Sequence, residues 1–150
     1  MGQNKINICI LGLGYVGLPL ALEFSKKYNV IGYDKSVRRV SQLKKKIDFN
    51  KEFSKQDLSI ENKLIYTNNI EKIAKCDIYI ITVPTPIKNN KLPDLSFLKN
   101  ACADVGKVLR KKNYVIFEST VFPGATEEVC VPILEKKIKL KLNKDFYCGY

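Results

Sequence analysis

Residues 6–17 read INICILGLGYVG, an apolar run that leads directly into three closely spaced glycines. The run over residues 6–11 has the length and composition of a buried β-strand. Three glycines follow it in the pattern G-x-G-x-x-G. They are Gly12, Gly14 and Gly17. Apolar residues then recur at helical spacing over residues 16–27, with Pro19 in the first turn, where a missing N–H costs little. The stretch predicts a strand, a tight turn and a helix in immediate succession.

Outward from this stretch, apolar runs of strand length alternate with segments of helical period. Further strands are predicted at residues 29–33, 64–67, 77–83, 114–117 and 146–148. Further helices are predicted at residues 37–46, 70–75, 96–110 and 126–137, the last interrupted or bent near Pro132. Ser96 is the expected N-cap of its helix. Residues 48–62, with at most a short helix, and the proline-rich residues 84–93 are predicted loops.

This alternation predicts an α/β fold of the Rossmann type. Strands that alternate with helices form right-handed crossovers, which build a doubly wound parallel sheet. The expected strand order is 3-2-1-4-5-6. Ligands of such sheets bind beyond the carboxyl ends of the strands, where the order reverses. The loops after the first, second, fourth and fifth strands are therefore the places to seek function.

The glycine loop has the composition of a pyrophosphate site. Gly12 permits the turn, Gly14 allows close approach of a phosphate, and Gly17 lets the helix pack on the sheet. The helix N-terminus adds N–H groups and a partial positive charge. A purely structural turn is the alternative reading. A protein-kinase glycine loop lies between two strands, whereas a helix follows here, and no G-x-x-x-x-G-K-[ST] pattern occurs.

Asp34 supports a dinucleotide and favours NAD. It ends the second predicted strand about twenty residues after the loop, where an acidic residue accepts hydrogen bonds from the adenosine ribose. Its charge would repel the 2′-phosphate of NADP. Lys35, Arg38 and Arg39 follow and could offset part of that repulsion.

Composition narrows the remaining classes. The chain has 150 residues and a formal charge of +11, but its lysines are scattered and lack interleaved aromatic residues, so nucleic-acid binding is not expected. No run reaches the roughly 18 residues that cross a bilayer, and no signal-peptide pattern occurs, so a cytoplasmic location without membrane attachment is expected. Five scattered cysteines and no histidine argue against a metal site.

Four motifs together resemble the UDP-glucose/GDP-mannose dehydrogenase family. They are GLGYVGLPLA at 12–21, Asp34 with Arg39-Val40 and Leu43, VPTP at 83–86, and ESTVFPG at 118–124. The resemblance runs in order along essentially the whole chain. Glu118 and the following segment through Glu128 look most like the branch acting on UDP-N-acetylhexosamines, which includes enzymes of surface-polysaccharide synthesis. Lys46 and Lys112 depart from the family pattern, which often has glycine there, and are expected to lie in surface turns.

The resemblance implies oxidation of a UDP-sugar C6 alcohol to the uronic acid with two NAD+. It places Thr120 beside the nicotinamide, where its hydroxyl would help to position the catalytic water. A helix cap or turn is the alternative role for that hydroxyl. Cofactor contacts are expected from the glycine loop and from the loops after the second, fourth and fifth strands. These residues are Gly12, Gly14, Tyr15, Val16, Gly17, Asp34, Arg39, Val83, Pro84, Thr85, Ser119 and Thr120.

The resemblance also implies that residues 1–150 are one domain of a longer enzyme. The family continues from a Gly-Tyr pair into Ser-Pro-Glu, and here the pair is Gly149-Tyr150. The nucleophilic cysteine, the UDP-sugar domain and the region that forms homodimers or larger assemblies are expected beyond it, so the chain alone is expected to be inactive. Two alternatives stay open: a stand-alone NAD-binding regulatory module, and a dehydrogenase of the 3-hydroxyacid type.

Overall fold

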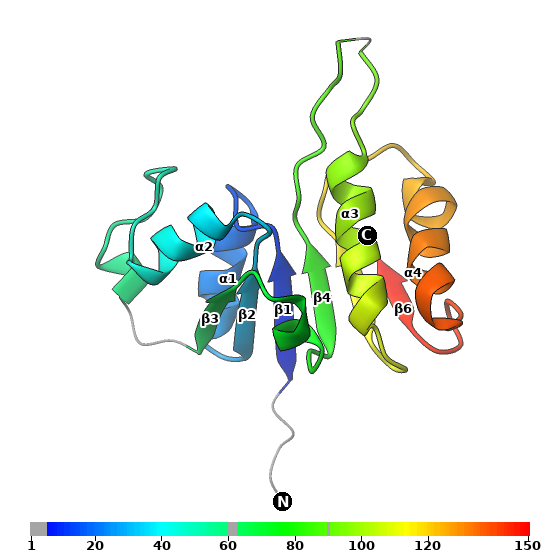
Figure 1. Cartoon of the computed structure of the whole chain (residues 1–150), viewed down its shortest axis with the longest axis horizontal. Helices are drawn as coiled ribbons and strands as arrows, with labels where there is room; N and C mark the ends of the chain where they lie inside the picture. Colours follow the sequence, from blue (N-terminus) through cyan, green and yellow to red (C-terminus); the bar gives the residue numbers. More distant parts are fainter. Residues whose placement is uncertain (1–5, 60–62, 90) are drawn as a thin grey trace, which may run out of the picture.

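A computed structural model describes residues 6–59, 63–89 and 91–150 and contains one six-stranded parallel sheet. The sheet order is β3-β2-β1-β4-β5-β6, which confirms the expected order. The strands are β1 (Asn7–Leu11), β2 (Asn29–Tyr33), β3 (Leu64–Thr67), β4 (Ile78–Ile81), β5 (Tyr114–Phe117) and β6 (Tyr147–Gly149). The order reverses between β1 and β4, which lie side by side in Figure 1.

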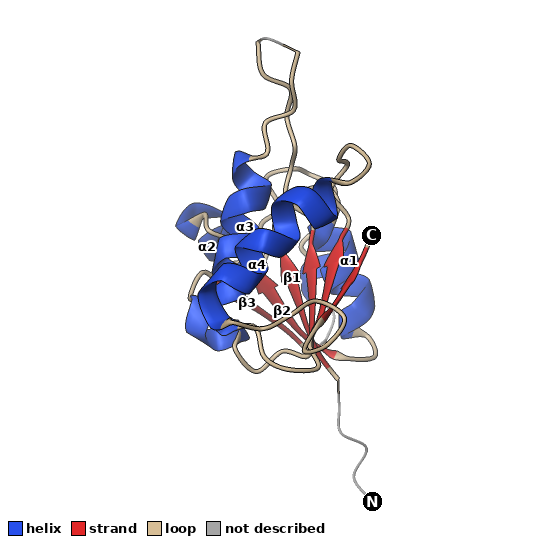
Figure 2. Ribbon diagram, turned by 90° about the vertical axis from the view of Figure 1, so that its right-hand side faces the viewer, coloured by secondary structure: helices blue, strands red, loops and turns tan. Residues whose placement is uncertain are grey.

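The helices cover both faces of this sheet. They are α1 (Gly17–Ser25), α2 (Val37–Lys44), α3 (Ser96–Val108) and α4 (Val131–Ile138), with short 3₁₀ turns at Asp57–Ser59 and Ile70–Ile73. Figure 2 shows α1 on one side of the sheet and the pair α3 and α4 on the other. Within the predicted loop at 48–62, residues 60–62 lie outside the described residues.

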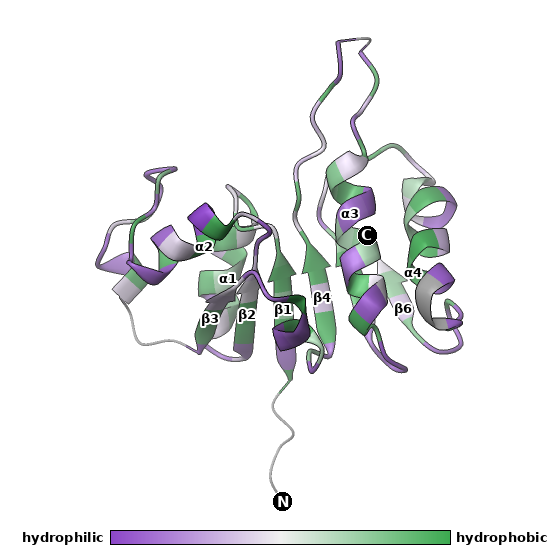
Figure 3. Cartoon of the chain, viewed as in Figure 1, coloured by the Kyte–Doolittle hydropathy of each residue, from purple (hydrophilic) through white to green (hydrophobic). Residues whose placement is uncertain are grey.

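Alternating strand residues divide the core into two clusters, one on each face. On one face, Cys9, Leu11 and Ile81 pack against α3 and α4. On the other, Ile8, Ile10 and Ile80 pack against α1, with Leu43 of α2 joining the cluster. Figure 3 shows the matching pattern, with hydrophobic residues concentrated on the central strands. The continuous apolar strands of the sequence are therefore explained by burial on both faces.

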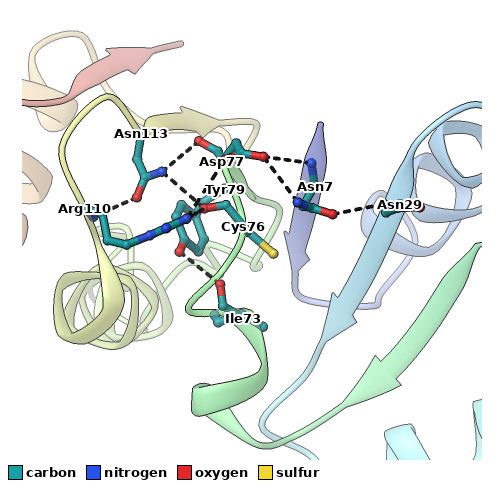
Figure 4. A network of polar contacts seen from close by, with 8 residues as sticks. All are labelled: Asn7, Asn29, Ile73, Cys76, Asp77, Tyr79, Arg110 and Asn113. Atoms are coloured by element: carbon teal, nitrogen blue, oxygen red, sulfur yellow. Dashed lines mark hydrogen bonds and ion pairs between the residues drawn. The ribbon is translucent and has the colours of Figure 1, made fainter. Parts of the chain in front are cut away.

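A polar network fastens the amino ends of the strands (Figure 4). Asn113 donates from Nδ2 to the carbonyls of Cys76 and Asp77, both at 3.2 Å, and accepts from the Arg110 N–H at 2.7 Å. The Asp77 carboxylate accepts from the Asn7 N–H at 2.9 Å. These bonds join β1, β4 and β5 at the edge of the sheet opposite the glycine loop.

Three local expectations need correction, and the first is the predicted helix at 70–75, which is a 3₁₀ turn over Ile70–Ile73. Leu95, not Ser96, is the N-cap of α3 and makes no side-chain capping bond; the Ser96 N–H donates instead to Asp94 Oδ1, two residues earlier, at 2.9 Å. The sixth strand lies one residue later than expected, and the buried Phe146 directly precedes it. The predicted helix at 126–137 is interrupted next to Pro132, as expected: a π-helical turn over Thr126–Cys130 precedes α4, and Pro132 lies in the first turn of α4.

Within the described residues, no helix is long and apolar enough to span a bilayer. The same part of the chain holds no group of three or more His, Cys, Asp or Glu side chains arranged for a metal ion.

Candidate functional site

A cleft of about 530 Å³ opens at the carboxyl ends of β1, β2 and β4, where the strand order reverses. This volume lies within the range of cofactor and ligand pockets. The cleft is lined by the glycine loop, the ends of β2 and β4, the start of α2 and one face of α3. Six of the predicted cofactor residues line it: Gly12, Gly14, Asp34, Arg39, Val83 and Pro84.

The glycine loop is held tightly between its neighbours. Gly12 has φ 97°, so the turn that leads from β1 into α1 is left-handed at this residue, and its N–H donates to the Tyr33 carbonyl at the end of β2 at 2.9 Å. The Thr82 hydroxyl lies 2.9 Å from the carbonyl of Leu11 and 2.7 Å from that of Gly12. A Cβ on Gly17 would lie 1.8 Å from the Gly12 carbonyl oxygen. Gly17 therefore permits the close approach of α1 to the loop.

Gly14 differs from these two glycines because it faces open space. A Cβ built on Gly14 meets no heavy atom within 4 Å among the described residues. The backbone at this point of the cleft is thus exposed to an incoming group. In the first turn of α1, the Leu18 and Leu20 N–H groups donate to the Gly14 and Val16 carbonyls and Pro19 has no N–H, so the positive end of the helix dipole is what this turn offers an anion.

The Asp34 carboxylate is fixed at the end of β2. Its Oδ2 accepts the Leu13 N–H at 2.9 Å, and its Oδ1 accepts the Ser36 N–H at 2.8 Å. Each oxygen retains acceptor capacity for a further donor. The side chain is half-buried and lines the cleft. It is therefore held ready for the hydroxyls of a ribose.

Arg39 lies in the wall of the cleft and is anchored by a buried acid. Its Nε donates to the Leu13 carbonyl and its Nη1 to Asp48 Oδ1, both at 2.8 Å. Asp48 is fully buried and also accepts N–H groups of residues 50, 52 and 53. Burial would raise the pKa of Asp48, but the hydrogen bonds, led by that from Arg39, outweigh it and lower the pKa. The ion pair therefore stays charged.

The loops after β4 and β5 are joined by two hydroxyl groups. Ser119 Oγ donates to the Val83 carbonyl at 2.5 Å, and Thr85 Oγ1 donates to the Thr120 carbonyl at 2.6 Å. Thr120 is exposed beside this junction. Thr85, Ser119 and Thr120 do not belong to the lining of the cleft, and neither do Tyr15, Val16 and Gly17 of the glycine loop. Of the predicted residues, six therefore line the cleft, three lie at the junction of the loops after β4 and β5, and three of the glycine loop lie outside both groups.

One wall of the cleft was missed by sequence reasoning. It comes from one face of α3, with Phe97, Asn100, Ala101 and Asp104. A signal was present: Asp104 is a charged residue among the buried positions of an otherwise apolar helical pattern. Thr82 and Asn50 also line the cleft without having been singled out.

Comparison with known proteins gives a family match over the whole described chain. The model of the UDP-glucose/GDP-mannose dehydrogenase family, NAD binding domain, matches residues 6–150. The UDP-N-acetyl-D-glucosamine 6-dehydrogenase of Pseudomonas aeruginosa is 48% identical over 148 residues, covering 99% of this chain and 35% of that protein. Its counterpart in Salmonella typhi is 49% identical over 149 residues, with the same coverage.

Solved structures of nucleotide-sugar dehydrogenases are also similar to this chain. The UDP-D-ManNAc dehydrogenase of Pyrococcus horikoshii has a TM-score of 0.86 and 34% identity, over 97% of this chain and 36% of that one. The GDP-mannose dehydrogenase of Pseudomonas aeruginosa, solved as a ternary complex, has a TM-score of 0.86 and 30% identity, over 94% of this chain and 34% of that one. The chain therefore spans about a third of the length of these proteins.

Proposed function

Because the chain belongs to the UDP-glucose/GDP-mannose dehydrogenase family, we propose that it is the NAD-binding domain of a longer nucleotide-sugar 6-dehydrogenase. The observation that carries the proposal is the position of Asp34 beside the glycine loop. Its carboxylate is fixed 2.9 Å from the Leu13 N–H, in the same cleft as the open face of Gly14. This pairing of an exposed loop backbone with a ribose-binding acid is what a dinucleotide requires.

Each part of the cleft has a distinct task in this proposal. The open backbone at Gly14 and the N-terminus of α1 receive the pyrophosphate. Asp34 accepts hydrogen bonds from the adenosine ribose, and Arg39 shapes the neighbouring wall. Phe97 and Ala101 of α3 supply the apolar surface against which a flat base can lie. The bound NAD+ supplies the hydride acceptor for oxidation of an alcohol.

The loops after β4 and β5 serve the reactive end of the cofactor. The bonds from Ser119 to Val83 and from Thr85 to Thr120 fix these loops relative to each other. They leave Thr120 exposed at the carboxyl end of β5, where its hydroxyl can hold a water near the reacting carbon without adding charge. Positioning of this kind is the contribution of Thr120 to catalysis.

The substrate we propose is a UDP-N-acetylhexosamine, with UDP-N-acetylglucosamine and UDP-N-acetylgalactosamine first. This choice is supported by the identity of 48% and 49% to two UDP-N-acetyl-D-glucosamine 6-dehydrogenases. Oxidation of the C6 alcohol to an acid removes two hydrides and so uses two NAD+. We assign the sugar site, the covalent chemistry and the oligomer contacts to chain beyond Tyr150. We also propose that the enzyme works in the cytoplasm.

The test uses the chain joined to the coding sequence that follows it. Purified protein is mixed with NAD+ and a panel of UDP-hexoses, UDP-N-acetylhexosamines and GDP-mannose, and absorbance of NADH is followed. The expected result is two NADH for each UDP-N-acetylhexosamine oxidised, and none from a Gly14→Val variant. NAD binding with no NADH from any sugar would contradict the dehydrogenase, whereas a stop codon directly after Tyr150 would favour a stand-alone module.

A further inference from the structure

We infer that Asp104 on α3 is a specificity-determining residue, which keeps NADP out by holding Lys35 in an ion pair. Lys35 directly follows the ribose-binding Asp34 and lines the cleft. A lysine in this place would otherwise be free to bind the 2′-phosphate that distinguishes NADP from NAD. The inference rests on the proposed function, because it concerns the same dinucleotide site.

The contacts of Asp104 commit Lys35 to a position against α3. Lys35 Nζ lies 2.9 Å from Asp104 Oδ2, and Lys107 Nζ lies 2.9 Å from Asp104 Oδ1. The Tyr33 hydroxyl donates to Oδ2 at 3.3 Å. The Asp104 side chain is only 6% exposed, whereas that of Lys35 is 57% exposed. A nearly buried carboxylate thus pulls an otherwise solvated ammonium group onto the wall of the cleft.

Burial makes this arrangement costly to undo. A buried carboxylate has lost its hydration and needs charged partners. Removing one partner leaves the buried charge incompletely compensated, which costs free energy. Burial would raise the pKa of Asp104, but the hydrogen bonds from Lys35 and Lys107 outweigh it, so the pKa is lowered and the ion pair persists at neutral pH. Burial and the neighbouring Asp104 charge raise the pKa of Tyr33 to about 12, so its hydroxyl remains a donor.

The other two cations of this segment are also engaged. Arg39 is bound to Leu13 and Asp48, and its remaining nitrogen, Nη2, is buried without a partner among the described residues. The Arg38 guanidinium lies 5.3 Å from the centre of the Phe49 ring. Lys35 differs from these two arginines, because a single substitution of Asp104 on α3 would release it into the cleft.

The chemistry of the 2′-phosphate turns this into selectivity. A phosphate monoester carries about −1.5 to −2 charges at pH 7. It would meet the Asp34 carboxylate while the described cations at residues 35, 38 and 39 are engaged with Asp104, Phe49 and Asp48. NAD carries hydroxyls there, which Asp34 accepts without a cation. Asp34 repels the 2′-phosphate and Asp104 keeps Lys35 away from it, so both acids disfavour NADP relative to NAD.

The experiment measures the ratio of NADP to NAD affinity by calorimetry at low ionic strength, using the purified chain and four variants. Asp104→Asn should raise the ratio about tenfold or more, since a freed charged hydrogen bond is worth about that factor. Adding Lys35→Met should abolish the gain, and adding Lys107→Met should leave it. Lys35→Met alone should change the ratio less than about twofold, because the wild-type lysine is withheld from the ligand.

The outcomes separate the two proposals. The role of the Lys35 pair is overturned if folded Asp104→Asn has the same ratio of NADP to NAD affinity as the wild type. It is also overturned if the gain in this ratio persists when Lys35→Met is added but disappears when Lys107→Met is added. If Asp104→Asn does not fold, Lys35→Met decides: a loss of NADP affinity of about tenfold or more means that Lys35 already serves the phosphate. No NAD binding by the unmodified chain contradicts the proposed function instead.

Discussion

The backbone N–H of Leu13 donates to Asp34 Oδ2 at 2.9 Å, so the acid proposed to bind the ribose also holds the glycine loop. The two residues are 21 positions apart, at the ends of adjacent parallel strands. The Asp34 carboxylate therefore fixes the glycine loop relative to the proposed ribose site. Because this geometry exists before the cofactor binds, the entropic cost of binding is lower.

Replacing Asp34 by Ala should weaken NAD binding about tenfold or more. Charged hydrogen bonds are worth about 1.5–3 kcal/mol, and each 1.4 kcal/mol is about a factor of ten. Calorimetric titration with NAD measures the loss. Asp77→Ala is the matched control, since Asp77 also accepts a strand N–H, from Asn7 at 2.9 Å, but at the opposite edge of the sheet. Equal NAD affinity in wild type and Asp34→Ala would reject the ribose assignment.

Gly14 and Gly17 should respond to side chains in opposite ways. Gly14→Val should keep the fold and lose NAD binding, because its Cβ enters open space where the pyrophosphate would lie. Gly17→Ala should destabilise the chain by at least about 1–3 kcal/mol, because its Cβ overlaps the Gly12 carbonyl and the backbone must shift. Circular dichroism melting and NAD titration of both variants check this. A Gly14→Val chain that unfolds would make Gly14 a folding residue.

Asp48→Asn should weaken both the fold and the cofactor site. Breaking a buried ion pair costs about 3–5 kcal/mol, and Arg39 would lose its anchor in the cleft wall. The folded-state pKa of Asp48 is lowered, so its contribution is present above the unfolded value of about 3.9 and is lost as the pH falls through the folded value.

The stability difference between wild type and Asp48→Asn should therefore shrink below about pH 4, where the unfolded carboxyl takes up a proton. Urea unfolding at several pH values measures it. Glu52→Gln provides the control, because Glu52 lies in the same segment but is exposed, and replacing its side chain should have little effect. A difference that stays constant between pH 7 and pH 3 would contradict the charged pair.

Lys46→Gly and Lys112→Gly should each stabilise the chain. Both lysines are exposed and adopt left-handed backbone conformations, with φ 60° and φ 68°. Relief of that strain gains about 1–2 kcal/mol, offset by about 0.5–1 kcal/mol for the greater freedom of glycine in the unfolded chain. The neighbouring Lys45 has φ −86°, so Lys45→Gly should destabilise instead. Melting temperatures that shift in the same direction in all three variants would contradict this explanation.

Local patterns predicted the framework and the glycine loop, since apolar runs and glycine spacing are properties of adjacent residues. The bounds of β2, β3 and β5 agree with those expected from sequence. Asp104 was missed because its contacts with Lys35 and Tyr33 span about seventy positions and depend on where α3 crosses the sheet. The same holds for the clamp from Thr82 to the glycine loop. Pairings between distant segments carry no periodic signal in one sequence.

The 150-residue chain alone should bind NAD and produce no NADH. Binding needs only the loop at Gly14 and the Asp34 carboxylate, which line one cleft, and the first turn of α1, which follows the loop; the two-sided core of the chain supports all three. Catalysis needs the sugar held over the nicotinamide, and we assign that site to chain beyond Tyr150. Correct positioning supplies about 7–11 kcal/mol of barrier reduction, so its loss alone would make turnover undetectable.

None of the five cysteines can replace the missing chemistry. Four are buried; burial and the neighbouring Cys76 raise the pKa of Cys9, and burial raises that of the half-buried Cys148 to about 12. A hydrogen bond with Cys102 lowers the pKa of Cys130, but Cys130 is only 1% exposed, so a substrate cannot reach its thiol. Protonated or inaccessible thiols are poor nucleophiles, so no covalent intermediate is expected for a second oxidation. Calorimetry with NAD, beside NADH absorbance with a panel of UDP-hexoses and UDP-N-acetylhexosamines at high protein concentration, makes the measurement. Sustained NADH formation from any of these sugars would require a complete active site within residues 1–150 and would overturn the assignment of the sugar site to chain beyond Tyr150.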